Sequence, residues 1–229
     1  MRTFKKFLVL LAILMSLPED LQAQDWPNLK QFQEANAEVG TASTDENRVV
    51  FMGNSITIGW LNKRPKFFAD KPYINRGISG QTTPQMLLRF RQDVIDLKPK
   101  VVVILAGTND IAGNTGPSTI DMIMDNIISM TELAKANDIK VILSSTLPAY
   151  KYSWRPEVEP ADKIVALNKK IKAYAIEKGH IYVDYFSAMA DERNGLPKEY
   201  ANDEVHPTPE GYMVMEPLVE KAIAEALEK

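Results

Sequence analysis

The 229-residue sequence contains no cysteine, which excludes disulfide bonds, thiolate metal ligands and a lipid-modified amino-terminal cysteine. It has only two histidines and no calcium-loop pattern, so we expect neither a metal site nor any other cofactor. A GxGxxG motif and a P-loop are also missing, and nothing indicates nucleotide binding. The formal net charge of −3 and the lack of a basic cluster argue against nucleic acid or an anionic membrane surface as partner.

The apolar runs are short, and none reaches the roughly 20 residues that a membrane-spanning helix needs. The clearest run, residues 7–17, follows a short basic stretch and precedes the small residue Ala23, which is typical of a secretory signal peptide. We therefore expect a signal peptide at residues 1–23 and a single domain at residues 24–229. The protein is expected to be exported to the periplasm or the extracellular space, without stable membrane insertion after cleavage. An uncleaved membrane anchor is the alternative.

After residue 47, short β-branched and aromatic runs alternate with helical patterns. Strands are predicted at 48–53, 73–76, 100–107, 139–144 and 181–184. Helices are predicted at 84–97, 119–137, 161–178 and 209–228, with a shorter one near 29–38. Continuous apolar strands favour a parallel sheet that helices cover on both faces. The predicted fold class is therefore α/β, a three-layer α/β/α sandwich with about five parallel strands in the order 2-1-3-4-5.

Polar residues follow several of these strands, at the sheet edge where ligands bind in open α/β folds. Ser55 comes after the first strand, Gly80 after the second and Asn109 after the third. Asp203 and His206 lie in the segment after the fifth strand, which is long enough to reach back to the first. Each residue alone has a plainer explanation: a helix cap, a turn glycine, a turn asparagine or a surface histidine. Their convergence on one edge favours a catalytic site.

These residue types fit nucleophilic attack on a carbonyl group. A serine hydroxyl becomes a good nucleophile when a histidine accepts its proton, and a carboxylate on the other ring nitrogen orients the imidazole. Because Asp203 and His206 are three residues apart, one tight turn can pair them. Asp184, at the end of the fifth predicted strand, is the alternative carboxylate. His180 has no carboxylate at a matching offset, and we expect it to be structural.

Four motifs resemble those of the SGNH hydrolases, the GDSL-like esterases and lipases, and they occur in family order. They are GNSIT at 53–57, GISG at 77–80, GTND at 107–110 and DEVHP at 203–207. The resemblance implies a flavodoxin-like SGNH fold and a serine esterase. One position departs from the family pattern, because Asn54 stands where the family usually has Asp. This change removes a charge beside the expected nucleophile and alters the local hydrogen bonding.

The resemblance also implies a role for each matching residue. Ser55 corresponds to the nucleophile, His206 to the base and Asp203 to the acid that orients the base. The backbone amides of Ser55 and Gly80 and the side-chain amide of Asn109 correspond to the oxyanion hole. Losing one such donor typically costs about 10²–10³ in rate, so each of these positions matters to the chemistry.

Aromatic side chains near the predicted site bear on the substrate. Trp60 follows the expected nucleophile, and the connection after the fourth strand carries Tyr150, Tyr152, Trp154 and Arg155. These side chains either contact the substrate, as a platform for a sugar ring or a wall for an acyl chain, or pack their loop onto the domain. The sequence leaves both readings open.

Export and aromatic side chains at the predicted mouth favour hydrolysis of short-chain, chiefly acetyl, esters on carbohydrates. The expected partner is therefore a small-molecule or glycan ester. No long apolar lid is evident, which argues against a lipase that acts on triglycerides. The alternatives are a lysophospholipase or thioesterase acting on lipid acyl esters, a catalytically silent carbohydrate-binding module on the same fold, and an acyltransferase with the same triad.

Overall fold

The computed structural model describes residues 24–40, 42–43 and 45–228. The predicted signal peptide, residues 1–23, lies outside the described residues. Within the described ranges, no helix combines the length and the apolar character that crossing a bilayer requires.

In the described part of the chain, parallel strands form one central sheet in the order β2-β1-β3-β4-β5, which confirms the predicted fold class. The strands are β1 (Val49–Gly53), β2 (Tyr73–Gly77), β3 (Val101–Leu105), β4 (Lys140–Ser144) and β5 (Ile181–Val183). The register pairs Gly53 with Gly77 on one side and with Leu105 on the other. Three strands therefore end level with one another, and the first three predicted motifs leave from the same edge.

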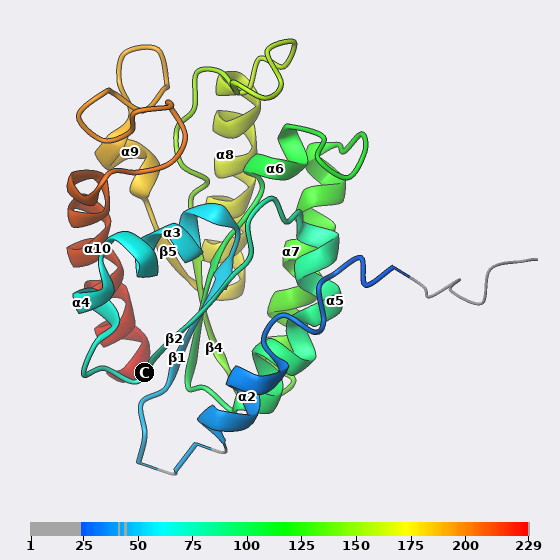
Figure 1. Cartoon of the computed structure of the whole chain (residues 1–229), viewed down its shortest axis with the longest axis vertical. Helices are drawn as coiled ribbons and strands as arrows, with labels where there is room; N and C mark the ends of the chain where they lie inside the picture. The colour runs from blue at the N-terminus through cyan, green and yellow to red at the C-terminus, as the bar shows by residue number, and fades with distance from the viewer. Residues whose placement is uncertain (1–23, 41, 44, 229) are drawn as a thin grey trace, which may run out of the picture.

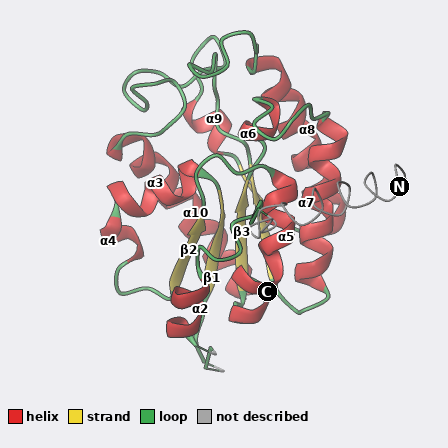
Figure 2. Ribbon diagram, turned by 45° about the vertical axis from the view of Figure 1, so that its right-hand side comes forward, coloured by secondary structure: helices red, strands yellow, loops and turns green. Residues whose placement is uncertain are grey.

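Helices cover both faces of the sheet. Figure 1 shows α5, α7 and α8 on one side and α3, α4 and α10 on the other, and Figure 2 shows the strands enclosed between these helices. The helices are α2 (Gln33–Val39), α3 (Ser55–Lys63), α4 (Pro65–Phe68), α5 (Thr83–Asp93), the 3-10 turn η1 (Ile95–Leu97), α6 (Thr108–Ile111), α7 (Ile120–Lys135), α8 (Ala161–Lys178), α9 (Tyr185–Met189) and α10 (Pro209–Glu228).

Each face of the sheet buries its own apolar cluster. Side chains alternate along β1, so Val50 and Met52 join the cluster formed with α5, α7 and α8. Val49 and Phe51 point the other way and join the cluster formed with α3, α4 and α10. All residues of β1 are buried. This two-sided burial explains why the strands are continuous apolar runs in the sequence.

The structure differs from the sequence predictions mainly in the connections between the strands and the long helices. The short helices α3, α4, α6 and α9 were not predicted, because so few residues show no clear helical period. Helix α5 ends at Asp93, and the 3-10 turn that follows leads to Lys98 in a left-handed conformation. Strand β5 ends at Val183, because the Asp184 side chain accepts a hydrogen bond from the amide of Ser187 and caps α9.

Gly77 lies where α3 crosses closely over the end of β2. A Cβ atom at this position would lie 2.3 Å from the backbone nitrogen of Ile58 and 2.8 Å from the carbonyl oxygen of Asn54. Backbone atoms cannot relieve such a clash by a rotamer change, so a side chain at position 77 would force the helix that begins at Ser55 to move. We expect Gly77→Ala to lower the free energy of unfolding by about 1–3 kcal/mol in urea denaturation. An unchanged denaturation midpoint would contradict this packing.

Candidate active site

Ser55 is the first residue of α3, and the residue before it caps that helix. The Asn54 Oδ1 atom accepts a hydrogen bond from the amide of Ile56 at 3.0 Å. The Asn54 side chain is only 1% exposed, so an amide caps the helix here without burying a charge. The departure from the family's Asp therefore keeps the cap acceptor, and Ser55 stays at the turn between β1 and α3.

The imidazole of His206 lies beside Ser55, although the two residues are far apart in the sequence. Ser55 Oγ and His206 Nε2 are 2.9 Å apart, and His206 Nδ1 is 2.7 Å from Asp203 Oδ2. The other carboxylate oxygen of Asp203 accepts hydrogen bonds from the amides of Val205 and His206, at 3.0 and 2.7 Å. Glu204 has a φ angle of 64°, so the turn passes through a left-handed residue. Serine, imidazole and carboxylate thus form one hydrogen-bonded series, the geometry that nucleophilic catalysis requires.

Two hydrogen bonds hold the loop with the imidazole against α3. Lys63 Nζ donates to the carbonyl oxygen of Pro207 at 2.6 Å, and the hydroxyl of Tyr212 donates to the carbonyl oxygen of Ile56 at 2.7 Å. The Trp60 ring stacks on the Tyr212 ring, with centroids 5.5 Å apart. These contacts, spread along α3, join it to Pro207 and to the first turn of α10, and they set the distance between the serine and the histidine.

The turn around Asp203 favours the charged form of its carboxyl. Partial burial opposes ionisation, but hydrogen bonds from the backbone amide and the ring of His206 and from the amide of Val205 outweigh it. Together they lower the pKa of Asp203 below its usual value. A carboxylate that stays charged at neutral pH can orient the imidazole and stabilise its protonated form.

The turn after β2 and the start of α6 are joined by Asn109. Its Nδ2 atom donates one hydrogen bond to the carbonyl oxygen of Gln81 at 2.9 Å. An amide nitrogen carries two hydrogens, so the second one can donate to another acceptor. Gly80 has a φ angle of 77°, a left-handed conformation that glycine adopts at little cost. The backbone amides of Ser55 and Gly80 donate no hydrogen bond to any acceptor within residues 24–40, 42–43 and 45–228. These two amides and the Asn109 side chain are the donors predicted for the oxyanion hole, and each keeps an N–H group that can bond a developing oxyanion.

A buried arginine that no motif indicated supports this turn. Arg89 of α5 donates to the carbonyl oxygens of Gly53 and Arg76, at 3.1 and 2.8 Å, and to the side chain of Gln81. Its charge is balanced by Asp93, 3.0 Å away, and both side chains are completely buried. One guanidinium therefore connects the ends of β1 and β2 to the turn with Gly80. In the sequence, Arg89 is one charged residue in a helical pattern and carries no signal of this role.

Asp110 is also buried, directly after Asn109. Its Oδ1 atom accepts hydrogen bonds from the amide and the hydroxyl of Thr83, at 2.9 and 2.6 Å. Burial raises the pKa of Asp110 to about 6, against the effect of these hydrogen bonds. The hydrogen bonds between Asp110 and Thr83 connect α6 to the start of α5 and help to position Asn109.

Of the two roles left open for the aromatic side chains, substrate contact is contradicted for Trp60 and Tyr152 by their burial. Trp60 is 2% exposed, because its ring is stacked between Phe67 and Tyr212. Tyr152 is 0% exposed, and its hydroxyl shares a hydrogen bond of 2.8 Å with the hydroxyl of Thr108. Neither ring offers a surface to a ligand, so both serve packing.

The other three predicted contact residues reach the surface. Tyr150 is 47% exposed, and the guanidinium of Arg193 lies 4.8 Å from the centroid of its ring. The Trp154 ring is 39% exposed, and its centroid lies 6.4 Å from that of His206. Arg155 is partly exposed and lies with Trp154 along a groove beside Gly80.

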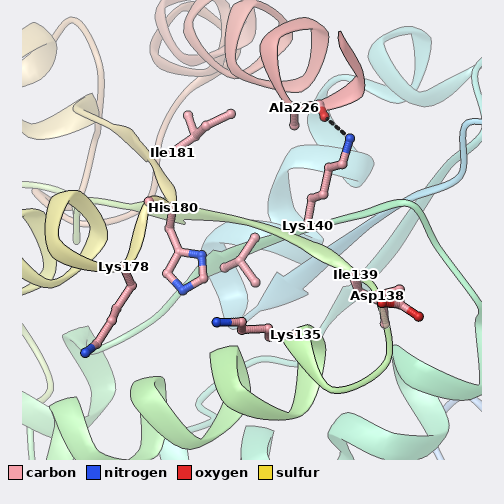
Figure 3. A pocket seen from close by; sticks show the side chains of 10 residues that line it. Lys135, Asp138, Ile139, Lys140, Lys178, His180, Ile181 and Ala226 are labelled. Carbon is pink, nitrogen blue, oxygen red and sulfur yellow. Dashed lines mark hydrogen bonds between the residues drawn. The ribbon is translucent and has the colours of Figure 1, made fainter. Parts of the chain in front are cut away.

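The alternative carboxylate and the second histidine lie elsewhere. Asp184 caps α9 and lies 3.7 Å from Lys172. His180 lines a cavity of about 500 Å³ at the amino ends of β4 and β5, together with three lysines, and Figure 3 shows that it contains none of the motif residues. No group of three or more His, Asp or Glu side chains in the described residues is arranged to hold a metal ion.

Comparison with known proteins identifies the family of this chain. Residues 51–214 match the model of the GDSL-like Lipase/Acylhydrolase family, so the chain belongs to this family. The family resemblance of the four motifs is thereby confirmed.

Two solved structures are similar over most of the chain. A candidate acylhydrolase from Bacteroides fragilis is 51% identical, with a TM-score of 0.87 over 89% of this chain and 99% of that one. A GDSL-like lipase from Bacteroides thetaiotaomicron is 50% identical, with a TM-score of 0.85 over 87% of this chain and 98% of that one. An acetylxylan esterase from Geobacillus stearothermophilus is 26% identical over 62% of this chain and 67% of its own length. The chain spans 32% and 46% of the lengths of two further curated relatives.

The stability of the protein should depend on the ionisation of Asp110. Its folded-state pKa of about 6 lies above the ordinary value of 3.8, so folding favours the protonated carboxyl. This contribution is complete below about pH 4 and is lost as the pH rises through 6. Between pH 5 and pH 8 we expect a loss of about 1 kcal/mol from this group in urea denaturation.

Asp110→Asn should remove this pH-dependent loss. Asp125→Asn, on the exposed face of α7, is the matched control and should retain it. The same pH dependence in wild type and in Asp110→Asn would show that Asp110 does not titrate in this range.

Proposed function

We propose that this protein is an exported serine esterase that hydrolyses short acyl esters, chiefly acetyl esters, on carbohydrates. Membership of the GDSL-like lipase/acylhydrolase family supports ester hydrolysis. The observation that carries the catalytic roles is the hydrogen-bonded series of Ser55, His206 and Asp203, with spacings of 2.9 and 2.7 Å. In this proposal Ser55 is the nucleophile, His206 the general base and Asp203 the residue that orients His206.

The reaction follows from the geometry. Ser55 Oγ attacks the ester carbonyl carbon while His206 Nε2 takes the hydroxyl proton. The carbonyl oxygen becomes an oxyanion, which accepts hydrogen bonds from the amides of Ser55 and Gly80 and from Asn109 Nδ2. The C–O bond to the alcohol then breaks, His206 returns the proton to the leaving alcohol, and an acyl-serine remains. Water, deprotonated by His206, attacks the acyl carbon, and the acid leaves as Ser55 regains its proton.

Two observations support a short acyl group on a carbohydrate. One relative, from Geobacillus stearothermophilus, is an acetylxylan esterase that matches this chain over 67% of its own length. The exposed ring of Trp154 lies beside His206, where it can stack on a sugar ring of the ester's alcohol. The amino-terminal sequence supports export, with cleavage after Ala23.

Removing a proposed catalytic side chain should abolish turnover without unfolding the protein. We expect Ser55→Ala and His206→Asn each to lower kcat/KM for 4-nitrophenyl acetate by at least about 10³-fold. The double variant should be no slower than either single variant, because residues that act as a unit are not additive. The controls are Ser129→Ala on α7 and His180→Asn at the opposite sheet edge, and both should retain wild-type rates. Full activity in Ser55→Ala would exclude this mechanism.

The proposed acyl preference is tested with 4-nitrophenyl esters of increasing chain length. We expect kcat/KM to fall at least about tenfold from acetyl to octanoyl, because the groove beside Gly80 is lined chiefly by polar side chains and additional methylenes gain little there. Highest activity on the octanoyl ester would instead favour a lysophospholipase or thioesterase. Glycan binding without hydrolysis of any ester would favour the carbohydrate-binding module.

A further inference from the structure

A groove of about 600 Å³ lies next to the turn that carries Gly80. Trp154 and Arg155 line it from the connection between β4 and α8, and Trp26 lines it from the amino-terminal segment. The Trp26 ring is 41% exposed, and no sequence motif indicated a role for it. The groove therefore brings together two exposed tryptophans that are far apart in the sequence, beside a proposed oxyanion donor.

The segment with Trp26 is held in place by glutamine side chains. Gln85 Nε2 donates to the carbonyl oxygen of Trp26 at 2.7 Å, and Gln81 Nε2 donates to that of Pro27 at 2.8 Å. Gln92, about two helical turns beyond Gln85 on α5, donates from Nε2 to the carbonyl oxygen of Leu29 at 2.6 Å. Figure 1 shows this dark blue segment running beside α5. The wall that carries Trp26 is thus bonded to the same turn and helix that support the oxyanion side of the site.

The part of the groove with Trp154 is joined to Gly80 through Asn114. Trp154 Nε1 donates to Asn114 Oδ1 at 3.2 Å, and Asn114 Nδ2 donates to the carbonyl oxygen of Gly80 at 3.2 Å. Beneath it, the buried Tyr152 ring stacks on Trp154, with centroids 4.9 Å apart. The indole of Trp154 therefore lines the groove on one side and lies 6.4 Å from the His206 ring, centroid to centroid, so the groove adjoins the proposed base through this side chain.

We infer that this groove binds a sugar ring of the ester's alcohol, and that Trp26 is a specificity-determining residue that contacts the ring from the wall opposite Trp154. The inference rests on the proposed esterase function and names the part of its substrate that Trp26 recognises. A pyranose ring presents apolar C–H faces and a polar edge of hydroxyl groups. Indole rings match the faces, and the Arg155 guanidinium and the exposed Ser79 hydroxyl can bond the edge.

The lining of the groove favours a sugar over an acyl chain. Between the two indoles, the lining is made largely of amide, hydroxyl and charged side chains. A long acyl chain would leave these polar groups without water or a partner, which costs free energy. Sugar hydroxyls replace the lost water with hydrogen bonds.

The test compares a small ester with a sugar ester in the same variants. We expect Trp26→Ala to raise KM for acetylated xylo-oligosaccharides by about tenfold while kcat/KM for 4-nitrophenyl acetate stays within about twofold of wild type. Trp26→Phe keeps an aromatic face and should restore most of the affinity. Ile176→Ala, an exposed apolar position on α8, is the control and should change neither substrate's kinetics.

A binding measurement separates this inference from the proposed function. In a Ser55→Ala background, calorimetry with acetylated xylo-oligosaccharides should show about tenfold weaker binding when Trp26→Ala is added. Unchanged binding and unchanged KM in Trp26→Ala would overturn the groove assignment while leaving the esterase intact. An equal loss on both substrates would also overturn it, because Trp26 would then act on the whole site. Absence of hydrolysis of any ester by wild type would instead remove the proposed function.

Discussion

The attachment of α10 to α3 determines whether this protein has an active site. The proposed nucleophile opens α3 and the proposed base precedes α10, and no covalent link near the site joins these elements. Noncovalent contacts hold them together: the stacked rings of Trp60 and Tyr212, and the ion pair of Arg64 with Glu216 at 2.8 Å. A displacement of 1 Å would break the hydrogen bond between serine and imidazole, so the aromatic cluster on this face of the sheet serves the chemistry as well as stability.

The opposite side of the site is supported by different physical means. There the Gly80 turn and the start of α6 depend on a buried charge network rather than on aromatic packing. Arg89 bonds three acceptors and is paired with Asp93, so its charge is compensated inside the protein. Breaking such a pair leaves an unbalanced buried charge, which makes this side intolerant of substitution. The proposed active site thus lies between α3 and α10, which are held together largely by aromatic packing, and the Gly80 turn, which is held by hydrogen bonds to buried charges.

The sequence was sufficient for the fold and for the identity of the residues that gather at the carboxyl edge. Continuous apolar runs indicated β1 and β3 because burial on both faces is a local property of each strand. The direction of Trp60 was not predictable, since it depends on α10, which lies far along the chain. The roles of Arg89 and Asn114 were equally hidden, because each depends on acceptors from other segments. Trp26 was missed for the same reason, as its place beside Gly80 results from hydrogen bonds to α5.

The position of the amino-terminal segment has a practical consequence for making the protein. Gln24, Asp25, Trp26 and Asn28 line the groove, so an affinity tag or fusion partner joined just before them would emerge beside the proposed sugar-binding groove. The other end is a safer place for such an addition. Ala226 accepts a hydrogen bond from Lys140, the first residue of β4, so α10 finishes at the edge of the sheet remote from the serine. Recombinant material intended for kinetic work is best extended at its carboxyl terminus.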